Sequence, residues 1–161
     1  MRIRTAGAHD IDGCIRLLVA LPDHFTAATH DQLRASFAAS HVVVMDDDGS
    51  VVGFAMAERR HRAAAEITCA AVHPTRHREG ICSAIVRQVL TDLAARDVAL
   101  VEVKTLDAAA GYEPYVATRL FWEHHGFIQV DCIDPLPGWE AGNPCAIYIR
   151  ALIPADASVD R

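Results

Sequence analysis

Residues 65–93, AEITCAAVHPTRHREGICSAIVRQVLTDL, decide the fold of this chain. The first part is rich in small and β-branched residues, which favours a strand, and Pro74 ends it because proline cannot continue a ladder. A helix is predicted after Gly80, where apolar residues recur every four positions. They are Ile81, Ile85, Val89 and Leu93. The basic segment between strand and helix leads into a helix N-terminus, whose unpaired N–H groups favour an anion such as a pyrophosphate.

The flanking sequence extends this strand–helix junction into a longer alternation. Further strands are predicted over residues 3–5, 41–45, 51–56, 98–105, 127–132 and 146–152. Asp10 and Asp31 are suitable N-caps for two early helices, and a late helix over residues 115–125 ends at Gly126. The acidic triplet 46–48 is interpreted as a hairpin tip, with a cation site as the alternative, and residues 59–62 as a turn. The order predicts one mixed α/β sheet with helices on its faces.

Composition restricts the class of protein. A length of 161 residues fits one domain, predicted over residues 1–154, with a frayed tail over 155–161. The net charge of −6 and the lack of a Lys/Arg block argue against nucleic acid as a partner. No apolar run approaches the roughly 20 residues of a membrane span, and no signal peptide is evident, so a cytoplasmic location is expected. The five cysteines are expected to be reduced, and the nine histidines are too scattered to predict a metal site.

Two blocks of sequence resemble the GNAT acyltransferase superfamily. Residues 72–86, VHPTRHREGICSAIV, resemble its acetyl-coenzyme A motif, in which a strand ending in Val-x-Pro precedes Arg/Gln-x-x-Gly-x-Gly/Ala and a helix. Residues 117–127, ATRLFWEHHGF, resemble the helix that ends in Phe-Tyr-x-x-x-Gly-Phe. The stretch 115–127, with Pro137-Gly138-Trp139 and Asn143-Pro144, is also similar to small bacterial GNAT proteins of unassigned substrate. The resemblance implies a single-domain mixed sheet with helices on both faces and splayed parallel central strands.

The same resemblance implies acetyl-coenzyme A as a co-substrate. The residues implied to contact it are Ala71, Val72, His77, Arg78, Glu79, Gly80, Ile81, Cys82, Ser83 and Trp122. Arg76 and Arg78 would add positive charge. His77 stands where the family has Arg or Gln, a mild change if only its backbone N–H binds phosphate. Cys82 stands where a second small residue is usual, and it is either a small residue chosen for fit or a thiol made reactive by the helix N-terminus.

Catalytic roles are less clearly implied. Trp122 replaces the usual Tyr that protonates the departing thiolate, and its indole N–H is no acid near neutral pH. Tyr115 is the candidate acid, with Tyr112 as an alternative and packing on the sheet as a structural role. Glu66 is the candidate base, with Glu102 second, although either glutamate can instead lie at a solvated strand end or form an ion pair with a nearby Arg. A backbone N–H near Ala71 or Val72 would stabilise the oxyanion.

The function expected from these residues is acetyl transfer to a primary amine. The acceptor would be a small molecule or a peptide, attacking the thioester directly. A GNAT-like module that binds acyl-coenzyme A as a sensor or regulator is the alternative, motivated by Trp122 and the uncertain base. An oligomer scaffold that uses Trp139 is a third interpretation, and a homodimer is left open.

Overall fold

A computed structural model describes residues 1–152 of the chain, so the predicted tail at 155–161 lies outside the described residues. Its contacts form two compact units. One unit comprises Met1–Arg59 and Ile67–Asp92, and the other comprises Arg60–Glu66 and the chain from Leu93 onward. The strands follow the order β1-β2-β3-β4-β5-β7-β6 in one seven-stranded sheet, which confirms the predicted α/β class.

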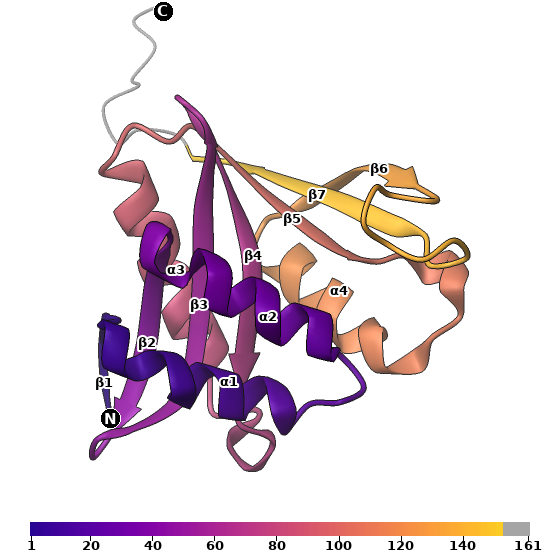
Figure 1. Ribbon diagram of the computed structural model, residues 1–161. Coiled ribbons are helices and arrows are strands. Elements are labelled where there is room, and N and C mark those ends of the chain that lie inside the picture. Colours follow the sequence, from indigo (N-terminus) through magenta and orange to yellow (C-terminus); the bar gives the residue numbers. More distant parts are fainter. Residues whose placement is uncertain (153–161) are drawn as a thin grey trace, which may run out of the picture. The chain divides into compact units, whose positions relative to one another are not determined.

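The first unit holds the N-terminal strands and three helices (Figure 1). Its strands are β1 (Arg2–Thr5), β2 (His41–Asp47), β3 (Ser50–His61, as far as Arg59) and β4 (Ala64–Val72, from Ile67). Its helices are α1 (Ile11–Val19), α2 (Ala27–Ser36) and most of α3 (Ile81–Ala94). The strand β2 pairs antiparallel with both β1 and β3. This unit therefore contains residues 67–92 of the predicted strand-to-helix junction at 65–93.

Adjacent residues of β3 show how helices cover the two faces of this part of the sheet. Phe54 is fully buried in an apolar cluster with residues of α1 and α2, such as Leu17 and Leu33. The neighbouring Gly53 faces α3, because a Cβ built on it would lie 2.9 Å from Cγ2 of Ile81. Successive side chains of a strand point to opposite faces, so α3 lies on the face opposite α1 and α2 (Figure 1).

The second unit contains β5 (Leu100–Leu106), α4 (Val116–His124), β6 (Ile128–Ile133) and β7 (Cys145–Ala151). The strand β7 pairs antiparallel with β5 on one side and with β6 on the other. Gly126 adopts φ +76° just after α4, which confirms the predicted glycine stop of this helix.

Three local predictions were wrong or incomplete. The helix α2 begins after Thr26, so Asp31 lies inside it and is not its cap. Of the predicted turn at 59–62, only Arg62 lies in a turn; residues 59–61 continue β3, where Arg60 pairs with Glu66. The acidic triplet is only partly a hairpin tip, since Asp46 and Asp47 belong to β2 and both form ion pairs.

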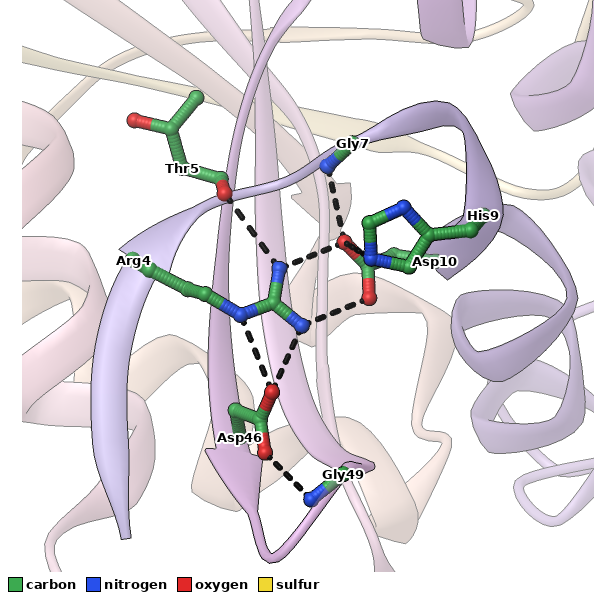
Figure 2. Close-up of polar contacts among 7 residues, drawn as sticks. All are labelled: Arg4, Thr5, Gly7, His9, Asp10, Asp46 and Gly49. Atoms are coloured by element: carbon green, nitrogen blue, oxygen red, sulfur yellow. Dashed lines mark hydrogen bonds and ion pairs between the residues drawn. The ribbon is translucent and has the colours of Figure 1, made fainter.

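Asp10 occupies the N-cap position of α1 as predicted, but its side chain makes no capping bond. Figure 2 shows what it does: the guanidinium of Arg4 lies between Asp10 and Asp46. Arg4 donates to both oxygens of Asp10, at 2.6 and 2.8 Å, and Asp10 also accepts from the N–H of Gly7 at 2.8 Å. These bonds hold the pKa of Asp10 below its usual value, with Arg4 the largest influence and burial opposing it. The charge cluster therefore ties β1 to the start of α1 and to the β2–β3 hairpin.

Candidate active site

The candidate cofactor loop, residues 73–80, connects β4 to α3. It starts with a short 3₁₀ turn, Pro74–Arg76, whose first N–H groups are partly capped by the His73 ring. The ring of His77 then turns back, and its Nε2 donates to the carbonyl of Val72 at 2.9 Å. The side chain of His77 is therefore used inside the loop. Its backbone N–H donates to the carbonyl of Pro74 at 3.4 Å, so both the ring and the N–H of His77 have partners inside the loop.

Two left-handed residues shape the end of this loop. Arg78 has φ +67° and Gly80 has φ +75°. A non-glycine residue pays a steric penalty in this region, so the loop holds Arg78 there against its intrinsic preference. A Cβ built on Gly80 would meet nothing within 4 Å, which leaves open space beside the first turn of α3. The loop and the helix start thus offer backbone N–H groups beside unfilled space, the arrangement that an extended anion such as a pyrophosphate requires.

Arg76 does not present a free charge to this space. Its Nη1 donates to Asp47 at 2.8 Å, and its Nε donates to both oxygens of Glu79 at 2.8 Å. Hydrogen bonding to Asp47, followed by that to Glu79, raises the pKa of Arg76. The expectation that Arg76 adds positive charge for a ligand therefore does not match the geometry, because two carboxylates balance that charge.

Cys82 lies in the first turn of α3 and is half-buried. Burial raises the pKa of its thiol to about 12. The thiol is accordingly neutral near physiological pH, and the helix N-terminus does not activate it. Of the two interpretations of Cys82, the small residue chosen for fit is the one that the geometry supports.

Glu66 is buried in a charge cluster of the second unit, with 6% of its surface exposed. Its Oε2 accepts from Arg60 Nε at 2.7 Å and from Lys104 Nζ at 3.0 Å. Lys104 also contacts Glu102 at 2.6 Å. Burial lowers the pKa of Lys104, but its bonds to Glu102 and Glu66 outweigh burial and raise it. Both candidate bases are therefore ion-paired: Glu66 has the Arg partner that the sequence left open, whereas the partner of Glu102 is Lys104.

Trp122 and Tyr115 also lie in the second unit. The indole of Trp122 is 5% exposed and packs edge-on against Phe121 and Phe127, with ring centroids 5.0 and 5.2 Å apart. Tyr115 is half-buried just before α4, and its ring centroid lies 6.0 Å from that of Tyr112. Trp122 thus takes part in an aromatic cluster that fixes α4, and the two phenols lie together at the start of that helix.

Tyr148 was not among the predicted site residues, although its hydroxyl has a carboxylate partner. Tyr148 is 1% exposed on β7, and its hydroxyl donates to Glu123 Oε1 at 3.0 Å. Burial, and after it the bond to Glu123, raises the pKa of Tyr148 to about 12. This pair could not be predicted from the sequence, because Tyr148 occupies an ordinary core position of a strand and Glu123 an ordinary solvent-facing position of a helix.

The predicted site residues divide between the two units. The first unit contains the predicted cofactor-binding residues of the segment 71–83, which are Ala71, Val72 and residues 77–83. The second unit contains Glu66, Tyr115 and Trp122. Within residues 1–152, no cluster of His, Cys, Asp and Glu side chains is arranged to hold a metal ion. In the same part of the chain, no helix has both the length and the apolar composition to span a bilayer.

Comparison with known proteins defines the class. The family model described as "Acetyltransferase (GNAT) domain" matches residues 38–129, more than half of the chain and all of the segment from β3 through the candidate loop to α4. The chain therefore belongs to the GNAT acetyltransferase family. Comparison with curated proteins gives no match.

Solved structures agree on the fold. A GNAT-family acetyltransferase from Desulfovibrio desulfuricans is 22% identical, with a TM-score of 0.80 over 93% of this chain and 98% of that one. An aminoglycoside 6'-N-acetyltransferase in complex with coenzyme A is 19% identical, with a TM-score of 0.75 over 96% and 98%. The ribosomal-protein-S18-alanine N-acetyltransferase from Escherichia coli is 15% identical, with a TM-score of 0.74 over 98% and 97%. At these identities the likeness shows the fold alone.

Proposed function

We propose that this protein is an acetyl-coenzyme A-dependent N-acetyltransferase that transfers the acetyl group to a primary amine of a small molecule or peptide. The observation that supports it most is the loop before α3, where left-handed Arg78 and Gly80 leave open space beside unpaired helix N–H groups. That geometry suits the pyrophosphate of coenzyme A. The N–H groups of residues 77–83 would bind it, that of His77 after leaving the carbonyl of Pro74, and the start of α3 would add its partial positive charge.

The bound co-substrate supplies a thioester whose carbonyl carbon an amine can attack. Backbone N–H groups at Ala71 or Val72, where β4 ends, would stabilise the charge that develops on the carbonyl oxygen. An ammonium acceptor must first lose a proton, and Glu66 is the proposed base, acting directly or through water. Because Oε2 of Glu66 already accepts from Arg60 and Lys104, this role requires its other oxygen, Oε1. Tyr115 is the proposed acid for the departing thiolate.

The binding step is tested by isothermal titration of acetyl-coenzyme A into the wild type and into two matched glycine variants. Gly80 and Gly138 both have positive φ, at +75° and +89°, and at both a Cβ would meet nothing within 4 Å. Gly80→Ala and Gly138→Ala therefore carry similar backbone strain, but only the first fills the proposed ligand space. We expect weaker binding for Gly80→Ala alone. No heat and no thermal shift with the wild type at millimolar ligand would refute the proposed cofactor.

A module that binds acyl-coenzyme A without turnover is the second candidate. It is favoured by the burial of Trp122 in an aromatic cluster and by the ion pairs that engage Glu66. An assay of free thiol release against a panel of amines separates the two functions. Steady release with any amine excludes the sensor function. Tight binding without release across the panel excludes the proposed acetyltransferase activity.

The acceptor class is proposed from charge. A net charge of −6 attracts cationic amines or basic peptides by steering. Two of the structural neighbours are described as acting on an aminoglycoside and on a ribosomal protein, which are one acceptor of each proposed class.

A domain over residues 1–154, a homodimer and a cytoplasmic location remain predictions from the sequence, and sedimentation at several concentrations tests the homodimer.

A further inference from the structure

The two aspartates at the end of β2 bind different arginines. Asp46 Oδ2 accepts from Arg4 Nη2 at 2.7 Å, and Asp47 Oδ2 accepts from Arg76 Nη1 at 2.8 Å. Neighbouring side chains in a strand point to opposite faces, so one hairpin end connects to the N-terminal charge cluster and to the candidate cofactor loop. The ammonium of Met1 also lies 3.5 Å from Asp47. This part of the acidic triplet is thus a structural anchor for the loop.

Arg76 transmits that anchoring to Gly80. Its guanidinium donates to Asp47 through Nη1 and to both oxygens of Glu79 through Nε. Glu79 immediately precedes the left-handed Gly80 and follows the left-handed Arg78. One cation, itself fixed to the β2–β3 hairpin, therefore holds Glu79, which stands between the two left-handed residues of the loop.

We propose that Arg76 is a positioning residue, and that the bridge Asp47–Arg76–Glu79 sets the loop in its binding conformation before coenzyme A arrives. This inference rests on the proposed function. A loop that is already ordered loses less conformational entropy on binding, so the bridge raises affinity although it makes no contact with the ligand. Arg76 as a direct phosphate ligand is the competing role.

The two roles predict opposite signs for Asp47→Asn. If Arg76 were a phosphate ligand, removal of Asp47 would release its charge and strengthen the binding of coenzyme A. If Arg76 positions the loop, the same change weakens binding, by about three- to tenfold for a coupling of this kind. Asp48→Asn is the matched control, because it removes the same charge from the exposed tip of the same hairpin. We expect it to leave the dissociation constant within about twofold of the wild type, as for a surface charge.

A double-mutant cycle adds Arg76→Gln and the double variant with Asp47→Asn. A bridge that acts as a unit gives strongly non-additive losses, and the double variant binds about as weakly as either single one. Tighter binding by Asp47→Asn, or a full further loss when Arg76→Gln is added to it, overturns the proposal.

Amide hydrogen exchange of the ligand-free protein provides a readout that does not depend on the proposed function. Asp47→Asn should speed the exchange of the loop amides that are hydrogen-bonded, which are those of Arg76, His77 and Ala84, while other amides keep their wild-type rates. Asp48→Asn should leave all of these rates unchanged. Unchanged exchange in the loop overturns the bridge even if coenzyme A binds. Failure of the wild type to bind coenzyme A, with faster exchange in Asp47→Asn, refutes the proposed function and leaves the positioning role of Arg76 standing.

Discussion

Asp10→Asn tests whether the charge cluster around Arg4 stabilises the N-terminal part of the fold. Asp10 is 4% exposed and accepts three hydrogen bonds, two from Arg4 and one from Gly7. Asparagine keeps one carbonyl oxygen and turns an amide donor toward the guanidinium, so at least one charge-assisted bond is lost. Such bonds contribute about 1.5 to 3 kcal/mol each. Breaking a fully buried ion pair costs about 3 to 5 kcal/mol.

The lower part of this range applies here for two reasons. Arg4 keeps its bonds to Asp46, and its side chain is 20% exposed, so water can reach it. We therefore expect a loss of about 2 to 3 kcal/mol in the free energy of unfolding at pH 7. For a chain of this size that corresponds to a fall in Tm of about 4 to 12 °C. Urea denaturation followed by circular dichroism measures the change, with an unchanged m-value as the check that only stability has altered.

Asp12→Asn is the control for Asp10→Asn. Asp12 lies in the first turn of α1 and so has a similar interaction with the helix dipole, but its pair with Arg34 at 3.2 Å is exposed. An exposed pair contributes about 1 kcal/mol or less. Equal losses in the two variants would refute the assigned role of the Arg4 cluster.

The stabilisation that Asp10 provides should decrease as the solution becomes more acidic. The pKa of Asp10 is lowered in the folded state, chiefly by its hydrogen bonds from Arg4. Its contribution is therefore fully present above the unfolded pKa of about 3.9 and is lost as the pH falls through the folded value. The difference between wild type and Asp10→Asn should be constant from pH 7 to about 5 and should shrink only in more acidic solution.

Three further predictions follow from the described side chains. The thiol of Cys82, with a pKa of about 12, should be alkylated at pH 8 about two to three orders of magnitude more slowly than an ordinary cysteine, and rapid labelling found by peptide mapping would contradict its burial. Gly53→Ala should reduce the free energy of unfolding by about 1 to 3 kcal/mol because its Cβ would lie 2.9 Å from Ile81, and an unchanged urea midpoint would mean that α3 shifts to make room. Tyr148, with a pKa of about 12, should ionise well above the ordinary phenol value of about 10 in an absorbance titration. Its contribution to stability is fully present below the unfolded pKa of about 10 and is lost as the pH rises toward 12, so Tyr148→Phe should flatten the fall in stability over that interval.

The sequence predicted the junction between β4 and α3 because its signals are local. Pro74 ends the strand, Gly80 stands where the backbone needs φ +75°, and the apolar repeat of the helix follows at once. The family resemblance depends on the same residues, and the match to the GNAT domain model confirms it. The start of α2 was less predictable, because both Thr26 and Asp31 are suitable caps and only Leu33 of this helix is buried.

The ion pairs that determine the role of each charged residue could not be predicted from the sequence, because the two residues of each pair are distant in the chain. Arg76 and Asp47 are 29 positions apart, and Lys104 and Glu66 are 38 apart. A charged residue beside a predicted ligand site is read as a ligand when its partner is unknown. Arg76 was interpreted in this way, and the geometry instead assigns its charge to two carboxylates of the protein.

Binding and catalysis therefore rely on different groups of this chain, backbone N–H groups for binding and side chains for catalysis. The proposed binding of coenzyme A relies on backbone N–H groups, which tolerate His77 and Cys82 because neither side chain has to act. Catalysis relies on side chains that must exchange protons, and an indole cannot replace a phenol as the acid near neutral pH. The aromatic packing of Trp122 accounts for its presence without any catalytic role. If steady thiol release is observed, the candidate sources of the proton are therefore Tyr115, Tyr112 and solvent. A loss of turnover with retained binding in Tyr115→Phe, and not in Tyr112→Phe, would assign the role to Tyr115.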